Sequence, residues 1–454
     1  MVSDGKLISV FEYDFLCFEL PCNGQERFRQ ISRPAFEYIK QLCLSKEAAQ
    51  AAFKLRIQHQ REVLQAQNFA GVVITPDGTQ IEILPKIGRK TECYTSEQGR
   101  MTLLWMLKRL KEFRHLQTNQ ANIKTQKMPL MELFISQFLT AVSVLVKRGL
   151  RSDYRGEQDN LLFLKGKLSV SRQLRYNLVN RQRFAVNFDE FSVDRAENRL
   201  IHSALTIVAK YSRLASNQRL IKELRFSFDA VPPSCDYVKD FENVRSDRSM
   251  HTYEMPLAWA KIILEGLSPQ SMLGTQQAFS LLFPMEAVFE AYVAAELKRQ
   301  LLPTSKMTAQ ARSHWLVTHD SANWFRLKPD IVIDATQACF VLDTKWKVLD
   351  QKENNASAKY GVSTADLYQM FAYGHTYLDG CGDMYLIYPL QSAFDTAVEL
   401  PLEYVCSNET GKKLRLWLVP FEINDSCGKL HLPCTQGLLA SALVAEKTND
   451  GAIC

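Results

Sequence analysis

The sequence predicts a multidomain protein of mixed α/β (α+β) class, whose C-terminal part holds a mixed central sheet flanked by helices. Two β-rich runs, 329–333 and 339–346, flank a short turn-like link, and a third apolar run covers 383–389. Helical apolar spacing precedes these runs at 283–293 and follows the second at 363–373. Strands and helices that alternate in this order favour a sheet whose faces are covered by helices.

The N-terminal region, residues 1–127, mixes helical runs with a hairpin. Helical patterns cover 34–44 and 48–67. Two apolar runs within 71–87 turn at the Pro-Asp-Gly sequence of residues 76–78. We therefore expect a mixed α/β region here.

Long helical patterns dominate the middle of the chain from residue 128 to 215. A polar, turn-rich segment follows at 234–253 and separates this part from the C-terminal pattern. The change in pattern predicts a mostly helical middle domain over 128–253 and a third domain over 254–454. The helix expected over 255–265 fits either side of this boundary.

Composition is that of an ordinary soluble globular protein, with 46% hydrophobic and 23% charged residues. No apolar run reaches the roughly 18 residues that span a bilayer, and the first residues lack a secretory pattern. We therefore expect a cytoplasmic protein without a membrane partner. The eleven cysteines include no CxxC pair, so a structural zinc site is not indicated.

Two carboxylates and a lysine stand on the two β-rich runs. Asp343 and Lys345 are two residues apart and so project to the same side of a strand, and pairing of the two runs brings Asp330 close to Asp343. This set is typical of metal-assisted phosphodiester hydrolysis. The carboxylates hold Mg²⁺ or Mn²⁺, while the lysine orients or deprotonates the attacking water. The alternative is a solvated strand face with a cross-strand ion pair.

The flanking helices carry further polar side chains with one-face spacing. Glu286 and Glu290 are four residues apart, so either is placed to reach a metal ion held by the aspartates. Gln369 and Tyr373 share a face of the later helix and are expected to contact the sugar-phosphate backbone of DNA. The alternative for each glutamate is a solvated helix face.

A basic segment between residues 160 and 186 contains six basic residues and no acid. Such a segment suits a phosphate backbone, which it would bind with salt-dependent and sequence-independent affinity. A solvated helix surface or a protein interface is the equally weighted alternative. The residues expected to bind DNA are Lys165, Lys167, Arg172 and Arg175.

The order of these motifs resembles the PD-(D/E)xK nuclease fold, with the Gln-x-x-x-Tyr helix of its RecB-like branch. More closely, the chain resembles the McrC family, the nuclease subunits of McrBC 5-methylcytosine restriction systems. Phe289-Glu290 matches a Phe-Glu pair of that family, which favours Glu290 over Glu286 as the helix carboxylate. The other matching segments, colinear from about residue 81 to 389, are Ile81–Gly88, Gly149-Leu150, Tyr154, Leu164–Leu168, Glu190–Asp194 and Asn198–Ile201.

The resemblance implies a DNA endonuclease subunit that acts on modified double-stranded DNA in bacterial or archaeal defence against phage and other foreign DNA. It also implies a partner, an McrB-like AAA+ ring that binds GTP, since this sequence has no P-loop motif of its own. The N-terminal part would dock into the ring's channel, with Leu84, Pro85 and Lys86 as the contacting residues. The alternative for these residues is a domain strand that ends at a proline turn.

Two other functions fit the same residues. One is a RecB-like repair or recombination nuclease that acts without a ring partner. The other is a catalytically silent adaptor that regulates an AAA+ motor. The complete set of Glu290, Asp330, Asp343 and Lys345 argues against a silent adaptor.

Overall fold

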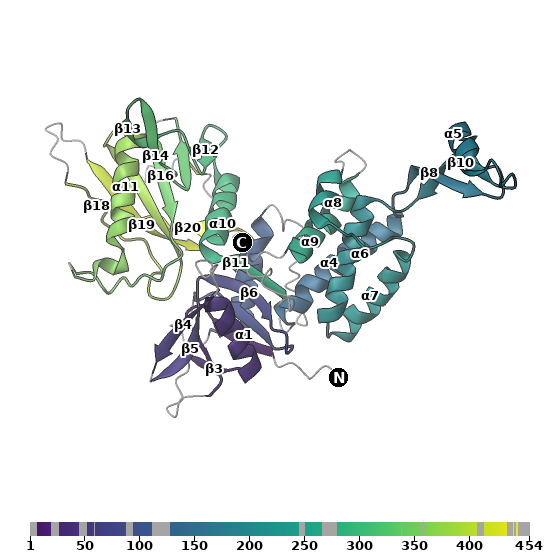
Figure 1. The fold of residues 1–454 in the computed structure, drawn as a ribbon. Helices are drawn as coiled ribbons and strands as arrows, with labels where there is room; N and C mark the ends of the chain where they lie inside the picture. Colours follow the sequence, from purple (N-terminus) through teal and green to yellow (C-terminus); the bar gives the residue numbers. More distant parts are fainter. Residues whose placement is uncertain are drawn as a thin grey trace, which may run out of the picture. The chain divides into compact units, whose positions relative to one another are not determined.

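The chain divides into two compact units (Figure 1). The first joins residues 1–127 and 268–454, and the second comprises 128–267. The computed structural model describes residues 7–19, 27–44, 52–58, 60–87, 94–110, 128–244, 250–265, 279–336, 338–355, 357–405, 413–433, 439 and 442–443.

This division differs from the predicted three domains over 1–127, 128–253 and 254–454. Helix α9 (His251–Glu265) lies in the second unit, where it packs with the helices of the middle region. Strand β11 (Phe279–Pro284) then pairs with β6 (Phe69–Ile74) of the N-terminal region. A strand that completes a distant sheet joins the two ends of the chain into one unit, a pairing that local sequence pattern does not reveal.

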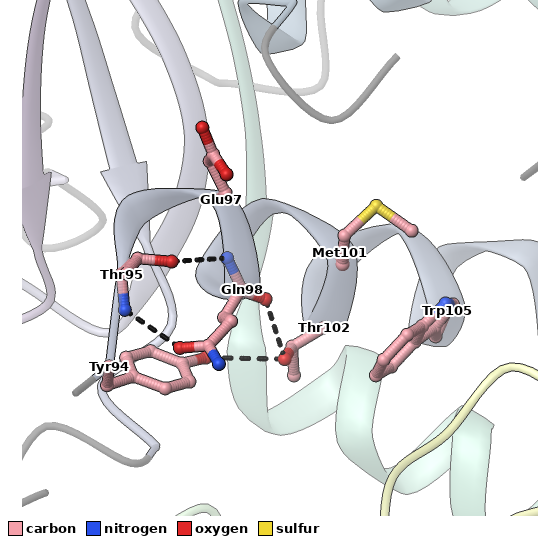
Figure 2. Close-up of a pocket in the computed structure, with 7 residues that line it drawn as sticks. All are labelled: Tyr94, Thr95, Glu97, Gln98, Met101, Thr102 and Trp105. Atoms are coloured by element: carbon pink, nitrogen blue, oxygen red, sulfur yellow. Dashed lines mark hydrogen bonds between the residues drawn. The ribbon is translucent and has the colours of Figure 1, made fainter. Parts of the chain in front are cut away.

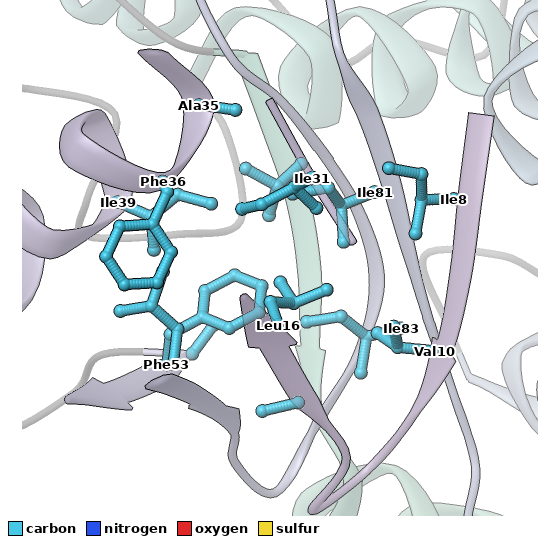
Figure 3. Packing of buried hydrophobic residues seen from close by; sticks show 14 of the residues in the cluster. Ile8, Val10, Leu16, Ile31, Ala35, Phe36, Ile39, Phe53, Ile81 and Ile83 are labelled. Carbon is cyan, nitrogen blue, oxygen red and sulfur yellow. The ribbon is translucent and has the colours of Figure 1, made fainter. Parts of the chain in front are cut away.

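Two four-stranded sheets form the N-terminal part of the first unit, in the orders β1-β7-β6-β11 and β3-β2-β5-β4. One hydrophobic cluster draws on both sheets and on helix α1, with Ile8, Leu16, Phe36, Phe53 and Ile83 among its members (Figure 3). The remaining bounds are β1 (Leu7–Phe11), β2 (Phe15–Cys17), β3 (Phe28–Gln30), α1 (Arg33–Leu44), β4 (Phe53–Gln58), β5 (Arg61–Ala66), β7 (Gln80–Leu84) and α2 (Ser96–Arg109).

The predicted helix over 48–67 is wrong, because within that range the structure forms the antiparallel strands β4 and β5. Gln60 takes a left-handed φ of 62° at the turn between them. Phe53 and Leu64 bury into the core cluster beneath α1. Packing of alternate residues against this core outweighs a helical spacing that a short apolar pattern shares with strands.

The C-terminal part of the first unit contains a mixed sheet in the order β12-β15-β16-β17-β19-β18, with β20 paired to β19. Strands β12, β15 and β16 pair antiparallel, whereas β16, β17 and β19 run parallel. The bounds are α10 (Met285–Gln300), β12 (Lys306–Ala309), β13 (Trp315–His319), β14 (Ala322–Arg326), β15 (Ile331–Asp334), β16 (Cys339–Thr344), η5 (Lys359–Gly361), α11 (Thr364–Tyr377), β17 (Gly382–Pro389), β18 (Leu402–Glu403), β19 (Leu414–Glu422) and β20 (Lys429–Leu430).

Helices α10 and α11 cover opposite faces of this sheet. Met370 of α11 packs in one cluster with Leu416 and Leu418 of β19. Phe421, which has the opposite parity on the same strand, meets the ring of Tyr292 on α10 edge-on at 5.9 Å. A mixed sheet between helices confirms the predicted α/β (α+β) class.

The second unit is a helical bundle with a small sheet. The sheet has the order β8-β10-β9 and, together with α5, forms a segment that we call the β8–β10 module, residues 153–192 (Figure 1). Helix α4 is long and apolar enough to cross a membrane, but 61% of its apolar window is buried, and it packs on α7 and α9 as a core helix does. The bounds are α4 (Leu130–Arg148), β8 (Asp153–Leu161), β9 (Lys167–Leu168), α5 (Val170–Tyr176), β10 (Phe184–Ser192), α6 (Ala196–Tyr211), α7 (Ala215–Ser227) and α8 (Tyr237–Asn243).

Candidate active site

Strand β16 and its continuation place Asp343 and Lys345 side by side, as the spacing predicts. The Lys345 Nζ lies 2.5 Å from Asp343 Oδ2. The backbone N–H of Lys345 donates to the carbonyl of Ile387 on β17 at 2.8 Å, so the sheet fixes the backbone from which this side chain projects. Both acidic and basic partners are thus held on a rigid strand end and not on a loop.

Asp330 stands immediately before β15 and is tied to the end of β16. Its Oδ2 accepts hydrogen bonds from the backbone N–H of Thr344 at 2.7 Å and from the Thr344 hydroxyl at 2.6 Å. The strand pairing of β15 with β16 therefore brings the two predicted aspartates together. Thr344 was not predicted as a functional residue, because it stands on the opposite strand face from Asp343 and Lys345.

Asp343 is almost fully buried, with 1% of its surface exposed. Its Oδ1 has no hydrogen-bond partner among the described residues, whereas Oδ2 forms an ion pair with the Lys345 ammonium. Burial, and next the negative charge of Asp330, raise the pKa of Asp343 to about 7, although Lys345 opposes this shift. A buried carboxylate oxygen without a donor is an unsatisfied acceptor, which a bound cation would satisfy.

The structure separates the two glutamates of α10. Glu290 accepts a hydrogen bond from the Gln310 side chain at 3.0 Å, and its pKa is raised by burial and then by the nearby charge of Asp330. The charge of Glu286 instead acts on Glu12. Glu290 therefore belongs to the aspartate pair, as the Phe-Glu match implies.

The carboxylate centre fits a hard divalent cation through two aspartates. Within the described ranges, no three His, Cys, Asp or Glu side chains form a closed metal-binding group. Magnesium commonly takes only one or two protein carboxylates and keeps several waters. The unsatisfied Asp343 Oδ1 beside Asp330 suits that mode of binding.

Gln369 and Tyr373 connect the lysine to α11. The Lys345 Nζ donates to Gln369 Oε1 at 3.1 Å, and the Gln369 amide donates to the Tyr373 hydroxyl at 2.8 Å. The Tyr373 hydroxyl in turn donates to the carbonyl of Lys328 at 2.9 Å. Tyr373 is buried and Gln369 is partly exposed, and together they link the Lys345 ammonium to the carbonyl of Lys328.

Leu84, Pro85 and Lys86 lie inside the first unit. Leu84 and Pro85 are buried at the end of β7, which is an inner strand of its sheet. This position favours the alternative stated above, a domain strand ending at a proline turn. A buried segment cannot enter a partner's channel while the sheet is intact.

Lys86 instead supports the strand that carries the lysine of the centre. Its Nζ donates to the carbonyl of Trp346 at 3.0 Å, one residue after Lys345, and its backbone N–H donates to Glu12 at 2.9 Å. The Trp346 indole N–H donates to the same Glu12 carboxylate at 2.9 Å. This contact between residues far apart in the sequence leaves no signal in local pattern.

The four basic residues predicted to bind DNA lie in the β8–β10 module of the second unit. Lys167 and Arg175 are exposed. Lys165 lies over the Phe188 ring at 3.9 Å, and Arg172 donates to the Gln158 side chain at 3.2 Å. Many apolar side chains are exposed around them: Tyr154, Leu162, Phe163, Leu164, Leu168, Val170, Leu174, Tyr176, Leu178, Val179 and Phe191.

The segment Asn198–Ile201, which matches the family and follows β10, has a structural role. Asn198 donates from its amide to the carbonyls of Arg151 and Val193 at 3.0 and 2.8 Å. Arg199 pairs with Asp194 and Asp240, each at 2.8 Å. These contacts tie the base of the β8–β10 module to the helices.

An open pocket lies along one side of α2 (Figure 2). Its lining includes the Thr95–Gln98 capping box and the hydrogen-bonded Tyr94 and Thr102 hydroxyls. None of its lining residues belongs to the carboxylate centre, so the size of this hollow says nothing about catalysis.

The chain matches the family model described as "McrBC 5-methylcytosine restriction system component" over residues 64–389. The chain belongs to this family. It is 23% identical over 239 residues to the type IV methyl-directed restriction enzyme EcoKMcrBC of Escherichia coli K12, covering 50% of this chain and 67% of that protein. Its fold also resembles a chain of the Thermococcus gammatolerans assembly of McrB AAA+ hexamers with bound McrC. That match has a TM-score of 0.65 and 18% identity, and it covers 92% of this chain and 95% of the other.

Proposed function

We propose that this McrBC-family chain is the DNA endonuclease subunit of a modification-dependent restriction complex, with a PD-(D/E)xK catalytic centre. The observation that carries the proposal is the buried Asp343 carboxylate beside Asp330: its Oδ2 pairs with Lys345, but its Oδ1 has no hydrogen-bond donor among the described residues. A purely structural ion pair would satisfy its own buried oxygens. The substrate would be modified double-stranded DNA of the methylcytosine type, and the role would be defence against phage and other foreign DNA.

The residues of this centre have different roles. Asp330 and Asp343 would hold Mg²⁺ or Mn²⁺, with Glu290 as a further carboxylate, and the ion when bound supplies Lewis-acid polarisation of the scissile phosphate. Thr344 fixes Asp330 through two hydrogen bonds. Gln369 fixes the ammonium of Lys345.

Lys345 acts as a cation in this scheme. Burial alone would lower the pKa of Lys345, but the charge of Asp343, together with Asp366 and Asp330, outweighs burial and raises it above its ordinary value. An ammonium that stays protonated at neutral pH orients the attacking water and offsets charge on the pentavalent phosphate.

We also propose that the chain works with an AAA+ GTPase ring of the McrB type and stimulates its GTP hydrolysis. The sequence has no P-loop, and its fold resembles a chain from an assembly of McrB hexamers with bound McrC. GTP would therefore be bound by the partner.

The β8–β10 module is the surface that we assign to this ring. A soluble monomer rarely exposes so many clustered apolar side chains without a binding role. The exposed Leu178 and Val179 follow α5, and the basic residues Lys167 and Arg175 lie in the same module. This favours the protein-interface alternative for the basic segment. We therefore assign the ring contact to this module and not to Leu84, Pro85 and Lys86.

Metal dependence tests the nuclease proposal. Mn²⁺ should bind the chain and, like Mg²⁺, support DNA cleavage, whereas Ca²⁺ should bind without supporting it well. Asp343→Ala should weaken Mn²⁺ binding measured by titration calorimetry, because it removes a ligand from the centre. Asp395→Ala, an exposed aspartate of the same unit, is the matched control and should bind Mn²⁺ like the unmutated chain. Equal Mn²⁺ affinity in Asp343→Ala would place the metal elsewhere.

A further inference from the structure

The β13–β14 hairpin stands apart from every sheet of the first unit. Its two strands pair only with each other among the described strands, in antiparallel register from Trp315↔Arg326 to His319↔Ala322. Every strand residue except Trp315 is exposed. A two-stranded hairpin by itself is at best marginally stable in water, so its exposed apolar side chains suggest a binding surface.

Both ends of this excursion are fixed at the carboxylate centre. The backbone N–H of Gln310 donates to the carbonyl of Asp330 at 2.6 Å, and the Gln310 side chain donates to Glu290. After β14, the Lys328 carbonyl accepts a hydrogen bond from the Tyr373 hydroxyl. The hairpin thus leaves the centre at Gln310 and returns to it at Asp330.

The hairpin surface combines aromatic and basic side chains. Phe325 is 69% exposed and Trp324 is 47% exposed. The Arg326 guanidinium lies over the Trp315 ring at 4.6 Å from its centroid. Between residues 311 and 329 the basic residues are Arg312, Arg326 and Lys328, and the only acid is Asp320.

Phe325 adopts a backbone conformation that an aromatic residue rarely takes. Its φ is 56°, in the left-handed region that favours glycine. The ladder pairs Trp315 with Arg326 and Val317 with Trp324, but it leaves out the Leu316–Phe325 step between them. Because Phe325 is mostly exposed, packing within the described structure does not offset the energetic cost of this conformation. Strain of this kind is characteristic of functional positions.

We propose that the β13–β14 hairpin is a DNA-binding element that presses Phe325 against a base step beside the scissile phosphate. Arg326 and Lys328 would contact the flanking phosphates. Apolar wedges that partly unstack a base step are a known way to bend and hold a duplex. The net positive charge and the attachment at Asp330 favour DNA over a protein partner as the occupant. The inference rests on the proposed nuclease function.

The test measures DNA affinity without cleavage, in the full-length Asp343→Ala chain, by fluorescence anisotropy of a labelled duplex. Adding Phe325→Gly should weaken binding about tenfold, the loss expected for one stacking contact, and leave the salt dependence unchanged. Adding Arg326→Ala should instead lower the slope of log affinity against log salt by about one phosphate contact. Phe325→Trp should retain the affinity.

The Phe325→Gly variant distinguishes loss of the DNA contact from loss of the folded structure. Glycine takes the left-handed conformation freely, so Phe325→Gly should have a thermal unfolding midpoint equal to or above that of the parent. Phe226→Ala, which removes an 84% exposed phenylalanine from α7, is the matched control and should bind DNA like the parent.

Three outcomes decide the inference. Parental DNA affinity in a folded Phe325→Gly chain overturns it. Loss of AAA+ ring binding with parental DNA affinity also overturns it and assigns the hairpin to the protein partner. Failure of the unmutated chain, with ring, GTP and Mg²⁺, to cut DNA contradicts the proposed function instead; weaker duplex binding by Phe325→Gly would then still support a DNA-binding hairpin.

Discussion

Lys345 supplies the positive charge of the proposed catalytic centre. Its ammonium is held by Asp343 on its own strand and by Gln369 on α11. Lys345→Ala removes that charge but leaves both aspartates, so metal binding and fold should survive. DNA strand scission should fall by about 10²- to 10³-fold, the usual loss when one electrostatic donor to the transition state is removed.

Lys347 provides the comparison for this variant. It stands two residues further on and pairs with Asp366 at 2.6 Å instead of with the aspartate pair. Single-turnover cleavage should therefore fall much less in Lys347→Ala than in Lys345→Ala. Equal losses in the two variants would indicate that general positive charge, and not the placement of Lys345, supports cleavage.

Glu12 is a fully buried carboxylate that holds Lys86 and Trp346 behind the centre. Burial raises the pKa of Glu12 from 4.5 to about 7, against the opposing charge of Lys86, while the charge of Glu286 adds to the rise. The folded chain therefore retains a proton that the unfolded chain releases. The contribution of Glu12 to stability is full below about pH 4.5 and is lost as pH rises to about 7.

Glu12→Gln keeps the shape of this side chain and removes its titration. Relative to this variant, the unmutated chain should lose stability between about pH 5 and about pH 8, measured as the urea midpoint of unfolding. A difference between the two chains that stays constant over this pH range would contradict the assignment.

At the scale of single elements, the sequence predicted the parts of the centre that lie on regular strands and helices. Alternation placed Asp343 with Lys345, and helical spacing placed Gln369 with Tyr373, and the structure brings all four together. The sequence did not predict the contacts of Thr344 and Gln310 or the contact between Glu12 and Trp346. Those contacts depend on which strand ends meet in three dimensions, and local periodicity carries no such information.

The β8–β10 module shows the same limit on its surface. Basic composition predicted a DNA-binding segment, but the exposed apolar residues became apparent only once the strands were placed. Leu178→Ser with Val179→Ser should weaken binding of the AAA+ ring and lower the stimulation of its GTP turnover by about tenfold, because both side chains are exposed apolar contacts.

Two comparisons make this test selective. Phe226→Ser changes an equally exposed apolar residue elsewhere in the second unit and should leave GTP turnover unchanged. Alanine substitution of Lys165, Lys167, Arg172 and Arg175 tests whether the module binds DNA instead. A salt-sensitive loss of DNA binding in that quadruple variant, with normal GTP turnover in the serine double variant, would return the module to the DNA-binding prediction.

At the scale of the whole molecule, two sequence-distant regions share one unit. Strand β11 completes the N-terminal sheet, and the Glu12–Lys86–Trp346 contacts join that sheet to the end of β16. Removal of the hairpin over 71–87 should therefore unfold this unit, because most of β6 and all of β7 are lost. If the hairpin were instead a segment that inserts into a ring channel, the rest of the unit would stay folded without it. The division into units differs from the predicted domains for two reasons: α9 packs with the helices of the second unit, and β11 joins the C-terminal part to the N-terminal sheet.

The central claim is that this chain cuts DNA at the Asp330–Asp343–Lys345 centre. The most direct measurement is strand scission of a methylcytosine-containing duplex by the chain together with its AAA+ partner, GTP and Mg²⁺. The unmutated complex should cut the duplex. The same complex with Asp343→Ala should hydrolyse GTP at a near-normal rate and leave both strands intact. Cleavage by the Asp343→Ala complex at the unmutated rate would contradict the account.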